Sequence, residues 1–329
     1  MKRICSIILV MALSLCINVN AQTFNTDYQV LESFGYPTEI IDVMAPEYQS
    51  KIAASLATSP DKVQISSGTL KVNVLEEILK FVSTPDSEYL SAGVSEEKLL
   101  SKRNEINHIL TLDNESAAEW LGITLEEMNI LRSYIESGTD QDVEEFLRQS
   151  PLSRAGSITE AEMDFNITVD NNSSGNSIRY DVYITFAWSK PYWTDLFNDR
   201  IAISWGGELF ESNISKGNVD YYTYSRSGGV WKDFSEFGTM KLEDEESNSH
   251  LLLEFPQAIN VESMAKNGTF SFRLTKNDAD GEYTYIIARY GHQVIEVSGF
   301  GVTWGFPGVD FSTAFEQTDI ETGRIKIRY

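Results

Sequence analysis

Hydrophobic residues recur at different spacings in the first and second halves of the chain. Up to about residue 150 they recur every three to four positions, as in residues 46–56 and 95–110, which is the spacing of an amphipathic helix. Beyond about residue 160 they alternate with polar residues, as in residues 163–169 and 178–188, which is the spacing of a strand with one buried face. The pattern predicts an α+β protein, with a small helical region before a β region.

Short helices with capped starts are predicted in the first part. Ser116 and Thr124 each precede a glutamate by three positions, the spacing of a capping box, and Thr139 is placed to cap the next helix. Residues 63–82 are ambiguous, because residues 71–74 alternate whereas the rest look helical. Other predicted helices lie at residues 36–44, 46–56, 75–82, 95–110 and 140–148.

The second part predicts an antiparallel β-sandwich that resembles a jelly roll. Residues 163–169 and 178–188 form a hairpin around a polar turn at residues 171–176, and a second turn is expected at residues 277–281. About ten short strands without a long helix favour two packed sheets. The other predicted strands lie at residues 200–205, 219–225, 238–242, 250–255, 269–275, 282–290, 294–304 and 324–329.

The chain is expected to divide into a signal peptide, a helical domain, a linker and a β domain. Lys2 and Arg3 precede an apolar run at residues 4–17, and this order is typical of a secretory signal peptide cleaved after Ala21. We expect a secreted, extracellular protein without stable membrane insertion, because no later run of 18 apolar residues exists. The predicted divisions are residues 1–21, 22–150, 151–160 and 161–329.

Cysteine content and charge limit the chemistry of the mature chain. Its two cysteines, Cys5 and Cys16, both lie in the predicted signal peptide, so a disulfide, a thiolate nucleophile and a zinc–cysteine site are not expected. The whole chain has 26 Lys and Arg against 49 Asp and Glu, a net charge of −23. Such an acidic protein is a poor partner for nucleic acid, because phosphate binding needs a basic surface.

Signatures of known catalytic and metal sites are missing from the sequence. The three histidines, His108, His250 and His292, do not form a His-Glu-x-x-His motif, and Gly-x-Ser-x-Gly is absent. Residues 278–281 imitate part of a calcium loop but lack its first and last ligands, so a tight turn is favoured. The acidic run at residues 243–246 leaves weak binding of a divalent cation open. No metal site and no cofactor are predicted.

A pair of carboxylates could still make the protein a glycan hydrolase. Such enzymes need two acids that face each other across a groove, and a sandwich can place them on neighbouring strands. The candidate acids are Glu208 with Glu211, Asp195 with Asp199, and Glu254. None of them forms an alternating acidic pattern on one strand, so this reading is the alternative.

Aromatic residues are the most suggestive feature of the β part. Phe186, Trp188 and Trp205 continue the apolar alternation of their strands, which predicts core positions. Tyr192 and Trp193 follow Pro191 in a loop, where exposed rings could stack on a sugar or a partner protein. We therefore take Tyr192 and Trp193 as the predicted ligand-binding residues.

Two segments resemble uncharacterised secreted proteins of Gram-positive bacteria. The segments are residues 31–44 and residues 180–205, and neither contains a catalytic motif. The resemblance implies an exported two-part protein and assigns no functional residue. The sequence thus favours a secreted, non-enzymatic protein that binds an extracellular glycan or protein through loops of the sandwich, with the carboxylate-dependent hydrolase as the alternative.

Overall fold

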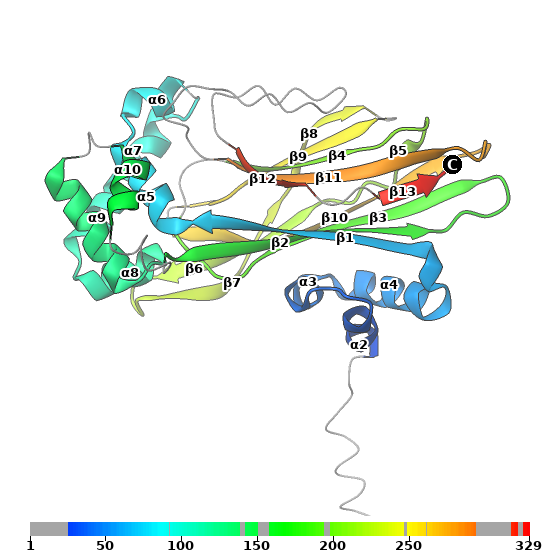
Figure 1. Ribbon diagram of the computed structural model, residues 1–329, viewed down its shortest axis with the longest axis horizontal. Helices are drawn as coiled ribbons and strands as arrows, with labels where there is room; N and C mark the ends of the chain where they lie inside the picture. The colour runs from blue at the N-terminus through cyan, green and yellow to red at the C-terminus, as the bar shows by residue number, and fades with distance from the viewer. Residues whose placement is uncertain are drawn as a thin grey trace, which may run out of the picture.

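Two antiparallel sheets that face each other form the body of the protein (Figure 1). The structure is a computed structural model, and it describes residues 26–91, 93–138, 142–150, 158–193, 198–246, 249–260, 262–293, 317–321 and 325–329. Helices and antiparallel strands are both abundant in these ranges, which confirms the predicted α+β class. The predicted signal peptide, the predicted strand at residues 294–304 and residues 151–157 of the predicted linker lie outside the described residues.

The first sheet runs in the order β1-β2-β3-β10-β6-β7, and β5 also pairs with β10. Its centre is the predicted hairpin, in which β2 and β3 pair with Phe165 opposite Phe186. The strands are β1 (Val63–Asn73), β2 (Glu160–Asn171), β3 (Ile178–Trp188), β5 (Phe210–Ser212), β6 (Asn218–Ser225), β7 (Val230–Thr239) and β10 (Ser263–Lys276).

The second sheet runs in the order β12-β11-β4-β9-β8, and β13 also pairs with β11. Its side chains meet those of the first sheet in a hydrophobic core, where the rings of Phe186 and Phe255 stack with centroids 5.0 Å apart. Phe186, Trp188 and Trp205 are buried as predicted. The strands are β4 (Asn198–Ser204), β8 (Lys241–Glu246), β9 (His250–Pro256), β11 (Tyr283–Gln293), β12 (Gln317–Glu321) and β13 (Ile325–Arg328).

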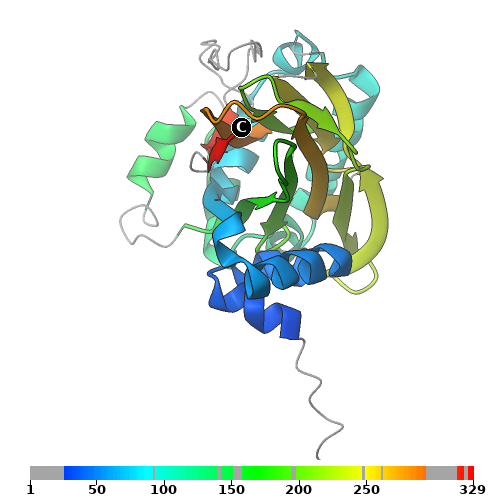
Figure 2. The ribbon, with the colours of Figure 1, turned by 90° about the vertical axis from the view of Figure 1, so that its right-hand side faces the viewer.

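The helices form two separate groups on this body. The first group, α2 to α4, lies on the outer face of the first sheet, and the second group, α5 to α10, gathers at one end of the sheets (Figures 1 and 2). The helices are α2 (Thr26–Ser33), α3 (Thr38–Val43), α4 (Pro46–Thr58), α5 (Val74–Ser83), α6 (Asp86–Ser91), α7 (Glu96–Thr111), α8 (Asn114–Leu121), α9 (Leu125–Ser137) and α10 (Val143–Gln149). A short 3-10 helix, η1 (Pro60–Lys62), follows α4.

A second, smaller core fixes the first helix group to the sheet. Apolar side chains of α2 to α4, among them Ile40, Ile52 and Leu56, are buried against Tyr183 and Ala187 of β3. The first sheet is therefore covered on both faces, by the other sheet on one side and by α2 to α4 on the other.

The part of the chain predicted to be helical also supplies a strand to the sheet. Residues 63–73, within the ambiguous segment, form β1, which pairs along its whole length with β2 from Val63 opposite Asp170 to Asn73 opposite Glu160. The second helix group shares one continuous hydrophobic core with both sheets. The sequence left residues 63–82 ambiguous within the predicted helical domain, because their alternation is clear only at residues 71–74.

Helix starts show which of the predicted caps form. The capping box at Thr124 is confirmed, with the Glu127 amide donating to the Thr124 hydroxyl and the Glu127 carboxylate accepting from the Thr124 amide. The predicted cap at Ser116 is wrong: Asp113 caps α8 and accepts from the Ser116 amide. Thr139 lies outside the described residues, and Asp142 caps α10. Among the described residues, no helix is both long and apolar enough to cross a membrane.

Replacing Thr124 with alanine is expected to lower the free energy of unfolding by about 1 kcal/mol, because the first turn of α9 loses its cap. Thr38 lies in the first turn of α3 but does not cap it, so Thr38→Ala is the control and is expected to change stability by less than about 0.5 kcal/mol. Urea denaturation followed by circular dichroism measures both values. Equal losses in the two variants would contradict a capping role for Thr124.

Candidate functional site

The two residues predicted to bind ligand, Tyr192 and Trp193, are buried. Their exposed fractions are 0% and 1%, so the expectation of exposed rings is wrong. The Trp193 amide donates to the Leu121 carbonyl (3.1 Å), and its ring packs on Phe81 with centroids 4.9 Å apart. Gly122 ends α8 at φ +74°, and a side chain there would come within 2.8 Å of Cβ of Tyr192. The pair joins the second helix group to the sheets instead of facing solvent.

The described acids that were predicted for a hydrolase lie in different surroundings. Glu208 is exposed in a loop, Asp199 is buried at 0% exposure, and Glu254 forms an ion pair with Arg200 (2.7 Å). Asp195 lies outside the described residues, and Glu211 lies on the short strand β5. In the part of the chain that the structure describes, no three His, Cys, Asp or Glu residues gather to hold a metal ion.

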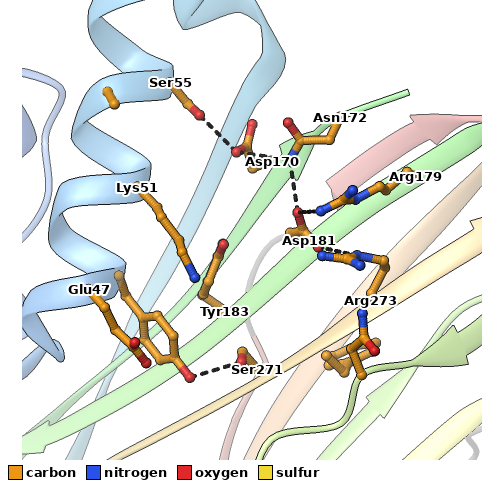
Figure 3. Close-up of a pocket in the computed structure, with 14 residues that line it drawn as sticks. Glu47, Lys51, Ser55, Asp170, Asn172, Arg179, Asp181, Tyr183, Ser271 and Arg273 are labelled. Atoms are coloured by element: carbon orange, nitrogen blue, oxygen red, sulfur yellow. Dashed lines mark hydrogen bonds and ion pairs between the residues drawn. The ribbon is translucent and has the colours of Figure 1, made fainter. Parts of the chain in front are cut away.

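A polar cleft of about 650 Å³ lies between α4 and the outer face of the first sheet (Figure 3). Helix α4 forms one wall, and strands β2, β3 and β10 form the other. The lining residues are Glu47, Tyr48, Lys51, Ala54, Ser55, Asp170, Asn172, Arg179, Asp181, Tyr183, Asn213, Ser271, Phe272 and Arg273.

Strand register places the charged residues of the sheet wall in one row. Asp170 of β2 is directly opposite Asp181 of β3, and Asp181 is directly opposite Arg273 of β10. Arg179 lies two residues before Asp181, so it points to the same face of the sheet. Like charges opposite each other destabilise a sheet, and the arginines offset this repulsion.

Helix periodicity places the other wall. Glu47, Lys51 and Ser55 are four residues apart, so they lie on one face of α4, toward the strands (Figure 3). The neighbouring face carries Ile52 and Leu56, which are buried in the smaller core. Docking of this apolar face on the sheet therefore holds the polar face above the charged row.

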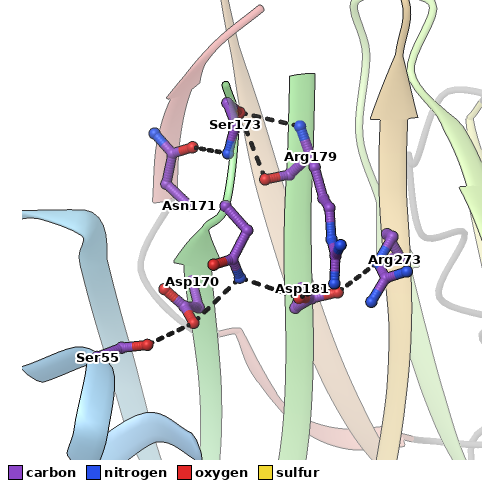
Figure 4. Close-up of polar contacts among 8 residues, drawn as sticks. Ser55, Asp170, Asn171, Ser173, Arg179, Asp181 and Arg273 are labelled. Carbon is purple, nitrogen blue, oxygen red and sulfur yellow. Dashed lines mark hydrogen bonds and ion pairs between the residues drawn. The ribbon is translucent and has the colours of Figure 1, made fainter. Parts of the chain in front are cut away.

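Hydrogen bonds join the two walls into one network (Figure 4). The Ser55 hydroxyl donates to Asp170 (2.8 Å), and the Asn172 amide donates to Asp170 (3.2 Å) and to Asp181 (2.9 Å). Asp181 also accepts from Arg179 (3.2 Å) and from Nε of Arg273 (2.6 Å). The network orients both guanidinium groups toward Asp181.

Two of the aromatic residues that line the cleft, Tyr48 and Tyr183, pack against each other. The rings of Tyr48 and Tyr183 lie with centroids 5.0 Å apart, and the Tyr48 hydroxyl hydrogen-bonds with that of Ser271 (3.0 Å). Burial, with smaller contributions from Asp181 and Asp170, raises the pKa of Tyr183 to about 12. The Tyr183 hydroxyl therefore keeps its proton at neutral pH and can donate a hydrogen bond.

Sequence reasoning missed this site, although one signal for it was present. The predicted hairpin around residues 171–176 brings Asp170 opposite Asp181. Two carboxylates that face each other need a cation to offset their repulsion. The cation comes from Arg273, whose pairing with β3 depends on contacts far apart in the sequence. The residues that α4 contributes to the cleft reach it only through tertiary packing of the helix on the sheet.

A second group of titratable residues is enclosed between the helices and the second sheet. His292 of β11 contacts Asp199 of β4 (2.8 Å) and Glu77 of α5 (2.9 Å), and the Tyr290 hydroxyl donates to Asp199. His292 and Asp199 are exposed by only 2% and 0%. In the described part of the chain, these contacts link α5 to β4 and β11.

No family model and no curated protein matches the chain. Among solved structures, it is similar to a collagen-binding domain from a Staphylococcus aureus adhesin, at 7% identity and TM-score 0.25 over 47% of this chain and 89% of that domain. It is also similar to a protein named BspA_C_mut (9%, TM-score 0.29, 51% and 55% covered) and to the RrgB pilus backbone from Streptococcus pneumoniae (9%, TM-score 0.21, 47% and 41% covered). The chain thus spans only about half of BspA_C_mut and less than half of the RrgB chain. Similarities this weak establish neither the family nor the activity of the protein.

Proposed function

We propose that the protein is a secreted, non-enzymatic protein that binds an extracellular glycan in the cleft between α4 and the first sheet. The observation that carries this proposal is the cleft itself, where fixed polar groups lie beside the ring of Tyr48 and the largely buried Tyr183. Sugars present hydroxyl groups around an apolar ring face, so they need donors and acceptors next to an aromatic surface.

The lining favours a glycan over a peptide. Of the 14 residues that line the cleft, only Ala54 and Phe272 are aliphatic or purely aromatic. Peptide-binding grooves usually offer apolar pockets for side chains, and such a pocket is absent from the described lining. Secretion, which brings the cleft into contact with extracellular glycans, is proposed from the sequence of residues 1–21.

The hydrogen bonding in the cleft favours binding over hydrolysis. A glycosidase needs one carboxyl group that gives a proton to the leaving oxygen. Asp181 accepts hydrogen bonds from the side-chain nitrogens of Asn172, Arg179 and Arg273. Amide and guanidinium nitrogens can only donate. Asp181 is thus committed as an acceptor inside the network and is not placed to donate to a ligand.

A glycan array probed with the mature chain tests the proposal. We expect binding to a subset of glycans, and we expect Tyr183→Phe to weaken it about tenfold, the effect of losing one hydrogen bond to a ligand. Tyr183 is a suitable choice because its hydroxyl has no hydrogen-bond partner among the described residues, so the change spares the fold.

Tyr285→Phe is the matched control, because Tyr285 is 45% exposed on β11 and is not part of the cleft lining. It should leave glycan binding unchanged. An array without any bound glycan, or equal losses in the two variants, would contradict the proposal.

A further inference from the structure

We infer that the glycan bound in the cleft carries an anionic group, a carboxylate or a sulfate, which Lys51, Arg179 and Arg273 recognise together. This inference rests on the proposed function and adds the chemical class of the ligand. Its basis is that Asp170 and Asp181, the acids of the sheet wall, are occupied within the protein, whereas the cations retain free donors.

The acids of the sheet wall face inward into the network. Asp181 accepts from three donors, and Asp170 accepts from Ser55 and Asn172. These contacts leave Asp181 with little capacity for a ligand hydroxyl. Glu47, the remaining acid of the lining, is exposed on the first turn of α4 (Figure 3).

The cations present unused donors to the cleft. Arg273 contacts Asp181 through Nε, and Arg179 contacts it through one terminal nitrogen, so each guanidinium keeps further N–H groups. Asp181 orients both groups, and oriented guanidinium groups suit carboxylate and similar oxyanions.

Lys51 supplies the third cation from the opposite wall. Its side chain extends from α4 toward the strands (Figure 3), and its ammonium lies 5.9 Å from the centroid of the Tyr48 ring. Within the described residues it forms no ion pair. A surface lysine without a carboxylate partner is notable in a chain with 49 acids and 26 bases.

The overall charge makes this local arrangement necessary for an anionic ligand. A net charge of −23 repels anions at long range, so only closely placed cations can hold one. Three cations from α4, β3 and β10 meet at the same cleft. A neutral glycan would need none of them.

Isothermal titration calorimetry with matched oligosaccharides tests the inference. The probes are an oligogalacturonate, its methyl ester, a heparin-derived oligosaccharide and maltotriose, each at low and high salt. We expect the oligogalacturonate or the heparin oligosaccharide to bind at least tenfold more tightly than the ester and maltotriose, with affinity falling as salt rises. Because heparin carries carboxylates as well as sulfates, binding of the heparin oligosaccharide alone would indicate sulfate recognition, whereas binding of both anionic probes would show that a carboxylate is sufficient.

Lys51→Met and Lys51→Arg identify the cleft as the site. We expect Lys51→Met to lower the affinity for the anionic probe about tenfold, and Lys51→Arg to retain most of the native affinity. Lys62→Met, in the exposed η1 helix, should leave the affinity unchanged.

Several results would overturn the inference. Equal affinity for the ester and the acid, or glycan-array binding confined to neutral sugars, would overturn the anionic class and leave the proposed function standing. Poly-glutamate binding as tightly as the oligogalacturonate would show recognition of charge without sugar. If no probe and no array glycan binds, both the inference and the proposed function fail.

Discussion

Replacing Trp193 with alanine is expected to lower the free energy of unfolding by about 3–5 kcal/mol, as for other buried tryptophans. The Trp193 ring packs on Phe81 of α5 and lies under the ammonium of Lys102 of α7, 4.7 Å from the ring centroid. Its loss would leave a cavity where the second helix group meets the sheets. Urea denaturation followed by far-ultraviolet circular dichroism, which reports on the backbone, measures the free energy of unfolding.

An exposed aromatic residue provides the control for this substitution. Phe210 of β5 is 52% exposed, and Phe210→Ala should change stability by about 0.5 kcal/mol or less. A Trp193→Ala variant as stable as the native protein, but unable to bind a glycan, would restore Trp193 as a ligand-binding residue and contradict the buried position.

Replacing His292 with glutamine is expected to lower the free energy of unfolding by about 3–5 kcal/mol near pH 6, because Asp199 and Glu77 lose the charge between them. Burial lowers the pKa of His292, but the charges and hydrogen bonds of Asp199 and Glu77 outweigh it and raise the pKa well above 6.5. The protonated imidazole therefore links α5 to β4 and β11. The Tyr290 and Tyr192 hydroxyls and the Trp188 ring complete its surroundings.

The raised pKa of His292 determines how its contribution to stability changes with pH. A group that is more basic in the folded state stabilises that state fully below its unfolded pKa of about 6.5. The stabilisation is lost as pH rises through the folded pKa. The stability difference between the native protein and His292→Gln should therefore be largest below pH 6.5 and shrink toward alkaline pH.

His108→Gln is the control for the pH series. His108 is exposed on α7, so its substitution should change stability by about 0.5 kcal/mol or less. Chemical denaturation of all three proteins at each pH supplies the comparison. A His292→Gln difference that stays constant or grows with pH would contradict a protonated His292.

Local patterns predict the elements of this protein well where the signal is short-range. The hairpin of β2 and β3 follows from the alternation around Phe165 and Phe186, and the start of α9 follows from the Thr124 capping box. Edge strand β1 was only partly visible, because the residues before Val72 alternate weakly.

The candidate site could not be predicted in the same way, because its parts come from distant segments. Asp181 and Arg273 face each other only when β3 pairs with β10, and Lys51 joins them only when α4 docks on the sheet. Trp193 was misjudged for the same reason: a loop position after Pro191 suggests exposure, whereas α5, α7 and α8 bury it. These contacts join residues that are far apart in the sequence, so local sequence patterns do not predict them.

Hydrogen–deuterium exchange with the best-bound array glycan tests the role of the cleft most directly. We expect the bound glycan to slow exchange in α4 and in residues 170–181, with no change in α7 at the far end of the sheets. Protection confined to α7, or to another surface, would contradict a binding site between α4 and the first sheet.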